Sequence, residues 1–146
     1  MPAAWDEDRV DALSKAIISL LQLSSDDVVV VEGPNDARSL RRLGLSARVI
    51  VCSREVSLPD LELRASTKPR GRRLVLLPDF DKEGRDKMRR WRSSFPRGRD
   101  VDTRTWSVLR SLLKREGIGV EGMAGLAERL GLLRGDMWLG PDERVS

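Results

Sequence analysis

Two aspartates that follow a short apolar run are the residues of this sequence best suited to chemistry. Asp79 and Asp81 come just after the run Leu-Val-Leu-Leu at residues 74–77. Residues two apart in an extended backbone point to the same side, so both carboxylates would share one face. Like charges held together need compensation, and Mg²⁺, which prefers hard oxygen ligands, would supply it. The alternative is a solvated, Asp-rich turn that leads into a helix.

A third carboxylate, Glu32, follows a second apolar run, four consecutive valines at residues 28–31. In an open α/β sheet, functional groups collect at the carboxyl ends of parallel strands. Glu32, Asp79 and Asp81 would then form a three-carboxylate site at one edge. Asp36 lies one helical turn after Glu32 and is a candidate supporting carboxylate around that site. It could equally serve as a favourable negative charge in the first turn of a helix.

These two motifs together resemble those of the Toprim domain. The residues that carry the resemblance are Val-Glu-Gly-Pro-Asn-Asp at 31–36 and Asp-Phe-Asp-Lys-Glu-Gly at 79–84. Toprim domains occur in topoisomerases, bacterial-type primases, some nucleases and the nuclease that matures 5S ribosomal RNA. The sequence is most similar to small stand-alone archaeal Toprim proteins, in which a Val-Asp-Thr segment follows, as at 101–103 here. The resemblance covers roughly residues 26 to 130.

The resemblance implies a metal-dependent enzyme with Mg²⁺, or Mn²⁺, as its cofactor. Asp79 and Asp81 would hold the metal, and Glu32 would be a further ligand or the general acid/base. The chain departs from many Toprim proteins after the second expected strand, where Cys-Ser-Arg at 52–54 replaces a glycine-containing turn.

The elements that must position these residues alternate along the chain. This alternation predicts an α/β fold, a compact Rossmann-like sandwich with a four-stranded, mainly parallel sheet flanked by helices. Expected strands are 28–31, 48–52, 74–77 and 100–102, and expected helices are 5–22, 34–43, 82–95, one capped by Thr103, and 121–133. A helical turn at 59–63 and a basic loop at 68–73 are also expected. The expected organisation is an N-terminal helix at 1–25, a Toprim domain at 26–135 and a C-terminal tail at 136–146.

The charge of the chain is compatible with a polyanionic partner. Lys and Arg number 27 against 23 Asp and Glu, which gives a net charge of +4 and a pI near 9.8. Most of the basic residues are Arg, whose guanidinium groups bind phosphate oxygens bidentately. Arg85, Arg89 and Arg92 form a stripe along the helix that follows Asp81. This stripe is a candidate nucleic-acid-binding surface, or else a solvated helix face.

The residues that are missing exclude several chemistries. The chain has no His and no Tyr. It therefore contains no Ser-His-Asp triad and no His-ligated zinc, and it cannot cleave DNA through a tyrosyl nucleophile. The single Cys52 excludes an internal disulfide and fits a reducing cytoplasm. No apolar stretch is long enough for a membrane span, so we expect a cytoplasmic protein without a membrane partner.

The sequence favours Mg²⁺-dependent phosphodiester chemistry on nucleic acid. By resemblance to the 5S ribosomal RNA maturation nuclease, the expected activity is an endonuclease acting on structured RNA, with RNA favoured over DNA. A metal-dependent, primase-like nucleic-acid-binding subunit without independent catalysis is the alternative, with a protein partner possible. A third interpretation gives the carboxylates a structural role only.

Overall fold

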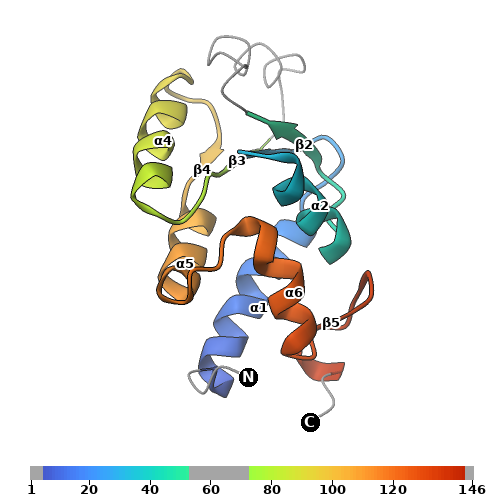
Figure 1. Ribbon diagram of the computed structural model, residues 1–146. Helices are drawn as coiled ribbons and strands as arrows, with labels where there is room; N and C mark the ends of the chain where they lie inside the picture. Colours follow the sequence, from blue (N-terminus) through green and yellow to red (C-terminus); the bar gives the residue numbers. More distant parts are fainter. Residues whose placement is uncertain (1–4, 53–72, 144–146) are drawn as a thin grey trace.

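The computed structural model describes residues 5–52 and 73–143, which form an α/β fold (Figure 1). In chain order, the helices are α1 (Glu7–Leu21), α2 (Pro34–Leu43), α4 (Lys82–Ser93), α5 (Arg104–Leu113) and α6 (Met123–Arg129). The strands are β1 (Val28–Val31), β2 (Arg48–Val51), β3 (Leu74–Leu77), β4 (Val101–Asp102), β5 (Leu133–Arg134) and β6 (Met137–Trp138). Short 3₁₀ helices cover Lys114–Glu116, Val120–Gly122 and Pro141–Glu143.

The main sheet has four parallel strands, which confirms the predicted four-stranded, mainly parallel sheet. Their order is β2-β1-β3-β4. The chain leaves β1 toward β2 on one side and leaves β3 toward β4 on the other side. The crevice outside the carboxyl ends of β1 and β3 is therefore a topological switch point, the usual ligand site of an open α/β sheet. Near the end of the chain, the antiparallel hairpin of β5 and β6 forms a separate small sheet.

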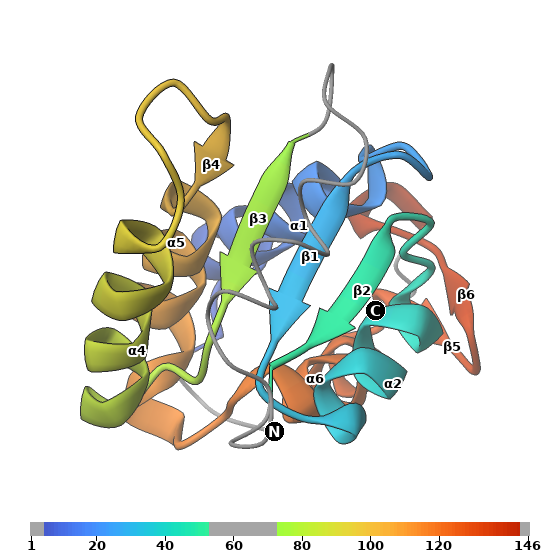
Figure 2. The ribbon, with the colours of Figure 1, turned by 90° about the horizontal axis from the view of Figure 1, so that it is seen from above.

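Helices cover the sheet in layers (Figures 1 and 2). α1, α2, α5 and α6 lie on one side of the sheet, and α4 lies at the opposite side beside β3. Right-handed crossovers that run in opposite directions from the centre place α2 and α4 on opposite faces. All four residues of β1 and of β3 are buried, because both strands are central and covered by other elements.

The core is built from apolar side chains that recur at helical spacing along the helices. Met88, Trp91 and Phe95 are buried along α4 and its end, and Trp106 and Leu109 are buried on α5. α2 ends at Gly44, whose φ of 108° lies in the left-handed region that favours glycine. The apolar face of α1 is buried in the same core.

Several boundaries differ from those predicted. The last helix, expected over 121–133, is a 3₁₀ turn followed by α6, which ends at Arg129 because the chain then turns into the β5 strand. The Thr103 side chain makes no capping hydrogen bond. Asp102 caps α5 instead, because its carboxylate accepts from the backbone N (3.1 Å) and the hydroxyl (2.8 Å) of Thr105. The expected turn at 59–63 and most of the expected loop at 68–73 lie outside the described residues.

Candidate functional site

Glu32 and Asp79 meet at the switch point. Each lies just beyond the carboxyl end of its strand, and β1 and β3 pair in register from Val28 with Leu74 to Val31 with Leu77. The backbone N of Asp79 donates to Oε2 of Glu32 at 2.5 Å. The structure therefore brings these two predicted residues together across neighbouring strands.

The loop that carries the aspartates is held from behind by α5. The indole Nε1 of Trp106 donates to the carbonyl of Pro78 at 2.9 Å, and Nε of Arg110 donates to the carbonyl of Phe80 at 3.1 Å. The Phe80 side chain is buried in the core, with 3% of its surface exposed. These contacts satisfy backbone carbonyls that no strand or helix pairs, and they fix Asp79 and Asp81 on either side of a buried anchor.

Asp81 is the N-cap of α4. Its Oδ1 accepts from the backbone N of Gly84 at 2.7 Å. Gly84 is required here by space, because a Cβ at this position would lie 1.7 Å from the carbonyl oxygen of Asp79. The glycine of the Asp-x-Asp-x-x-Gly motif thus lets the first turn of α4 approach the Asp79 backbone. Because of this close approach, the Asp81 side chain can cap α4, and Asp81 remains exposed to solvent.

Lys87 is a residue of the site that the sequence did not reveal. Its Nζ forms an ion pair with Oε1 of Glu32, and the Glu32 side chain is 14% exposed. The hydrogen bond to the Glu32 carboxylate raises the pKa of Lys87, so this side chain stays charged. Both oxygens of Glu32 are therefore occupied, one by Lys87 and one by the Asp79 backbone.

The carboxylate of Asp79 lies half-buried and without a bonded cation. Among the described residues, no hydrogen bond or ion pair reaches its side chain. Burial, followed by the charges of Glu32, Asp36 and Asp81, raises the pKa of Asp79 from 3.8 to about 6, although Lys87 opposes this effect. A strongly perturbed carboxylate in a cleft is typical of functional sites.

Asp36 has the helix-supporting role that was one of its two predicted roles. The residue is 6% exposed, and its Oδ2 accepts from the backbone N of Gly33 at 3.0 Å. Burial, and the charges of Glu121 and Glu32, raise the pKa of Asp36 although the Gly33 hydrogen bond lowers it. The charge of Asp36 also adds to the negative potential at Asp79.

A cleft of about 590 Å³ opens in front of the two aspartates. The residues that line it come from the loop after β3, from α4, from α5 and from the segment after α5: Asp79, Phe80, Asp81, Lys82, Arg85, Arg110, Lys114, Gly117, Ile118, Gly119 and Glu121. A Cβ on Gly119 would lie 3.5 Å from Oδ1 of Asp79, so the chain crosses close to this carboxylate. Acidic and basic groups thus share one opening.

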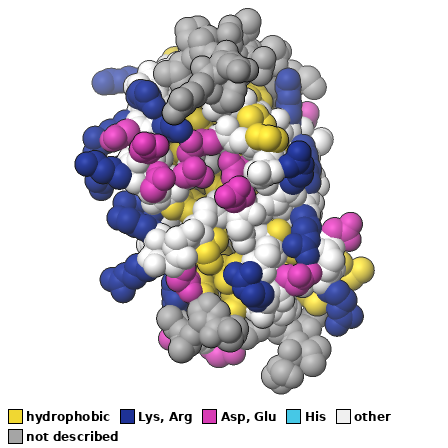
Figure 3. Space-filling model, viewed as in Figure 1, with side chains coloured by type: hydrophobic (Ala, Val, Ile, Leu, Met, Phe, Trp, Pro, Cys, Tyr) yellow, Lys and Arg dark blue, Asp and Glu magenta, His cyan; other side chains and the backbone are white. Residues whose placement is uncertain are grey.

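The arginine stripe is only partly at the cleft. Arg85 lines it, whereas Arg89 and Arg92 lie further along the exposed side of α4. Arg89 is 4.0 Å from Asp86, and both side chains are more than half exposed. Figure 3 shows this face of the molecule, where acidic side chains gather next to basic side chains on the side of α4.

The donor chemistry of the cleft fits Mg²⁺ in part. Mg²⁺ is commonly bound through one or two carboxylates, with water and substrate phosphate oxygens as the remaining ligands. Asp79 and Asp81 offer such oxygens, since the helix cap uses only Oδ1 of Asp81. Glu32 would first have to leave Lys87. Accordingly, within residues 5–52 and 73–143 no group of three metal-ligating side chains (Asp, Glu, Cys or His) converges closely enough to hold a metal ion.

Comparison with known proteins places the chain in a family. It is 34% identical over 108 residues to a UPF0292 protein of Thermococcus kodakarensis, covering 72% of this chain and 77% of that protein. It is 33% identical over 121 residues to a UPF0292 protein of Pyrococcus abyssi, covering 81% and 86% of the two chains. The chain belongs to the UPF0292 family. No family model matches this UPF0292 sequence.

A solved structure supports the fold of this UPF0292 protein. A protein from Aquifex aeolicus has a TM-score of 0.59 with it at 26% sequence identity, over 75% of this chain and 95% of that chain. Within the part of the chain that the structure describes, no helix is long and apolar enough to cross a membrane.

Proposed function

We propose that this UPF0292 protein is a Toprim-type enzyme that cleaves phosphodiester bonds in nucleic acid with Mg²⁺, with Mn²⁺ as a possible substitute. The observation that carries the proposal is the Asp79 carboxylate. It lies at the switch point, half-buried, beside three further carboxylates and without a bonded cation among the described residues, and its pKa is raised to about 6. A divalent cation would offset this negative potential. Without one, the raised pKa means that ionising Asp79 in the folded protein costs free energy.

The proposed roles follow from the contacts. Asp79 and Asp81 would hold the metal, which would clamp the phosphate and neutralise charge that develops in the transition state. Glu32, fixed by the Asp79 backbone and Lys87, would act as the general acid/base or as a third ligand. Arg85 and Arg110 line the same cleft and would bind the phosphate oxygens around the scissile bond.

The proposed substrate is structured RNA, favoured over DNA by resemblance to the 5S ribosomal RNA maturation nuclease. The proposed place of action is the cytoplasm, which a sequence with a single cysteine fits.

The test is a cleavage assay on end-labelled structured RNA, single-stranded RNA and duplex DNA, each with Mg²⁺ and with EDTA. We expect metal-dependent cleavage of RNA that falls by orders of magnitude in Asp79→Asn. The matched control is Asp27→Asn, which removes the same charge just before β1, at the opposite edge of the sheet, and should cleave as wild type. Cleavage that survives Asp79→Asn would refute the proposal.

A binding subunit without catalysis is the second candidate, because both oxygens of Glu32 are already engaged. In that case Mg²⁺ would raise the melting temperature by mass action, and the protein would bind nucleic acid, but no cleavage would occur in Mg²⁺ or Mn²⁺.

A further inference from the structure

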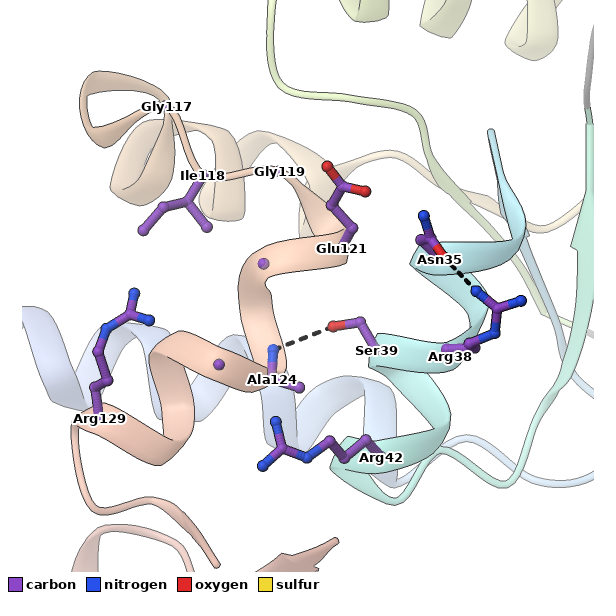
Figure 4. Close-up of a pocket in the computed structure, with 12 residues that line it drawn as sticks. Asn35, Arg38, Ser39, Arg42, Gly117, Ile118, Gly119, Glu121, Ala124 and Arg129 are labelled. Carbon is purple, nitrogen blue, oxygen red and sulfur yellow. Dashed lines mark hydrogen bonds between the residues drawn. The ribbon is translucent and has the colours of Figure 1, made fainter. Parts of the chain in front are cut away.

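A second cleft, also of about 590 Å³, lies beside the carboxylate cleft and is rimmed by arginines (Figure 4). Arg38 and Arg42 come from α2, and Arg129 comes from α6. Glu121 is the one acidic side chain among the lining residues, so the lining is basic. Gly122, just before α6, and Ala124 and Gly125, in the first turn of α6, also line this cleft.

This arginine cleft is preformed. Ser39 is 6% exposed, and its hydroxyl accepts from the backbone N of Ala124 at 3.1 Å, which ties α2 to the start of α6. Arg42 adds a second tie, because its Nε donates to the carbonyl of Gly135 at 2.7 Å and its guanidinium pairs with Glu128. A ligand would therefore meet an ordered rim.

Two of the three guanidinium groups are available for an anion. The Arg38 side chain donates to Oδ1 of Asn35 through one nitrogen, which leaves its other N–H groups for a ligand. Arg129 makes no ion pair or hydrogen bond through its side chain with any other residue that the structure describes, and it is exposed. Guanidinium groups bind phosphate oxygens bidentately.

The two clefts share a wall. Gly117, Ile118, Gly119 and Glu121 line both of them. Two of these residues are glycines, so a backbone that passes from one cleft to the other meets little side-chain bulk at the crossing. Glu121 stands at the crossing and also adds to the negative potential at Asp36. A nucleic-acid backbone that crosses here would pass the negative charge of Glu121.

We infer that the arginine cleft binds two backbone phosphates, one at Arg38 and one at Arg129, of the same nucleic-acid strand whose scissile phosphate lies at Asp79 and Asp81. The inference rests on the proposed function. The strand would leave the carboxylate cleft over Gly117 and Gly119 and continue between α2 and α6. No aromatic side chain is among the described residues that line this cleft, so bases would not be stacked there and binding would tolerate any sequence.

The test measures binding of a fluorescein-labelled single-stranded RNA of about 12 nucleotides by fluorescence anisotropy. EDTA is present, so that no cleavage is needed. The double variant Arg38→Gln/Arg129→Gln removes the two available guanidinium groups. The control Arg97→Gln/Arg104→Gln removes the same charge from exposed positions after α4 and at the start of α5.

The expected effect follows from counterion release. The slope of log K against log salt is negative, and each lost phosphate contact reduces its magnitude by about 0.7 for a single strand. Two contacts lower it by about 1.4, which at 0.1 M salt corresponds to about 25-fold weaker binding. The Arg97/Arg104 control should leave the slope close to wild type. Glu121→Gln should tighten binding, because it removes a negative charge from the crossing.

Equal slopes in the two double variants would overturn the inference, and so would an unchanged affinity in Glu121→Gln. Inorganic phosphate that binds as tightly as the RNA would also overturn it, because the cleft would then serve a free anion. The cleavage assay is separate. Arginine-dependent binding without cleavage defeats only the proposed chemistry, and cleavage without arginine dependence defeats only the arginine cleft.

Discussion

Replacing Asp79 by Asn should remove a pH-dependent loss of stability from the metal-free protein. The pKa of Asp79 is raised from 3.8 to about 6 in the folded state by burial and by the charges of Glu32, Asp36 and Asp81. Between these two values the unfolded chain loses the proton while the folded chain keeps it. The folded state then binds more protons, so stability falls as pH rises through this window and stays low above it.

The size of the effect follows from the shift. Each pKa unit corresponds to 1.36 kcal/mol, so the shift to about 6 sets an upper limit of about 3 kcal/mol. Solvent screening at this half-exposed cleft lowers the expected value to about 1–2 kcal/mol. The amide in the variant cannot ionise. The free energy of unfolding of the variant minus that of wild type should therefore grow by this amount between about pH 4 and pH 8.

The assay is urea unfolding in EDTA at several pH values across this range. Comparing its two ends cancels any constant effect of the amide, such as a new hydrogen bond. Asp27→Asn is the control, because the pKa of Asp27 is shifted in the opposite direction from that of Asp79. Burial raises the pKa of Asp27, but hydrogen bonds from Arg73 and Ser24 outweigh burial and leave this pKa lowered from 3.8.

The Asp27 carboxylate therefore stabilises the folded state above pH 3.8, and this contribution is lost as pH falls through its folded pKa. Relative to wild type, Asp27→Asn should lose stability at the acidic end of the range as pH rises, and the difference should then stay constant. A difference for Asp79→Asn that is flat with pH would refute the electrostatic account of the site.

Two further changes test the surroundings of the aspartates. Gly84→Ala should destabilise the protein despite the better helix propensity of Ala, because its Cβ would lie 1.7 Å from the Asp79 carbonyl oxygen and ordinary C···O contacts are about 3.3 Å or longer. Gly125→Ala, whose Cβ meets only Arg129 Nη1 at 3.6 Å, should leave thermal unfolding unchanged or raise the melting temperature; a similar response of both variants would contradict the packing. Replacing the stripe on α4 by Ala should lower the salt slope of RNA binding by about 0.7 per lost contact, and an unchanged slope would make it a solvated face. The stripe consists of Arg85, Arg89 and Arg92.

Much of the fold could be predicted because local signals agreed with tertiary structure. Four consecutive valines at 28–31 suit a strand that is covered on both faces, and Gly44 ends a helix at a left-handed position. The last helix was predicted too long, because an apolar periodicity continues from α6 into the strand at Leu133. The choice of Asp102 over its neighbour Thr103 as the cap depends on backbone angles that sequence does not fix.

In the candidate site, the carboxylates and Arg85 could be predicted from the sequence. Glu32, Asp79 and Asp81 each follow an apolar run, so parallel strands bring them to one edge. Lys87 lies within a charged helix, and its partner is 55 residues away, so its role depends on how α4 packs. Arg110 contacts the Phe80 carbonyl from α5, and this contact likewise depends on how the helix packs. Contacts between distant segments carry no local pattern.

Titration calorimetry with Mg²⁺ at about pH 7.5, where Asp79 is ionised, measures metal binding at the carboxylate cleft. We expect saturable binding to wild type, which is lost in Asp79→Asn and Asp81→Asn while both variants stay folded. An asparagine in place of Asp81 can still cap α4, so its loss of binding would not reflect a lost helix cap. The Asp27→Asn control should bind as wild type. Absence of saturable binding to wild type, or equal binding to wild type and both variants, would show that Asp79 and Asp81 do not hold Mg²⁺.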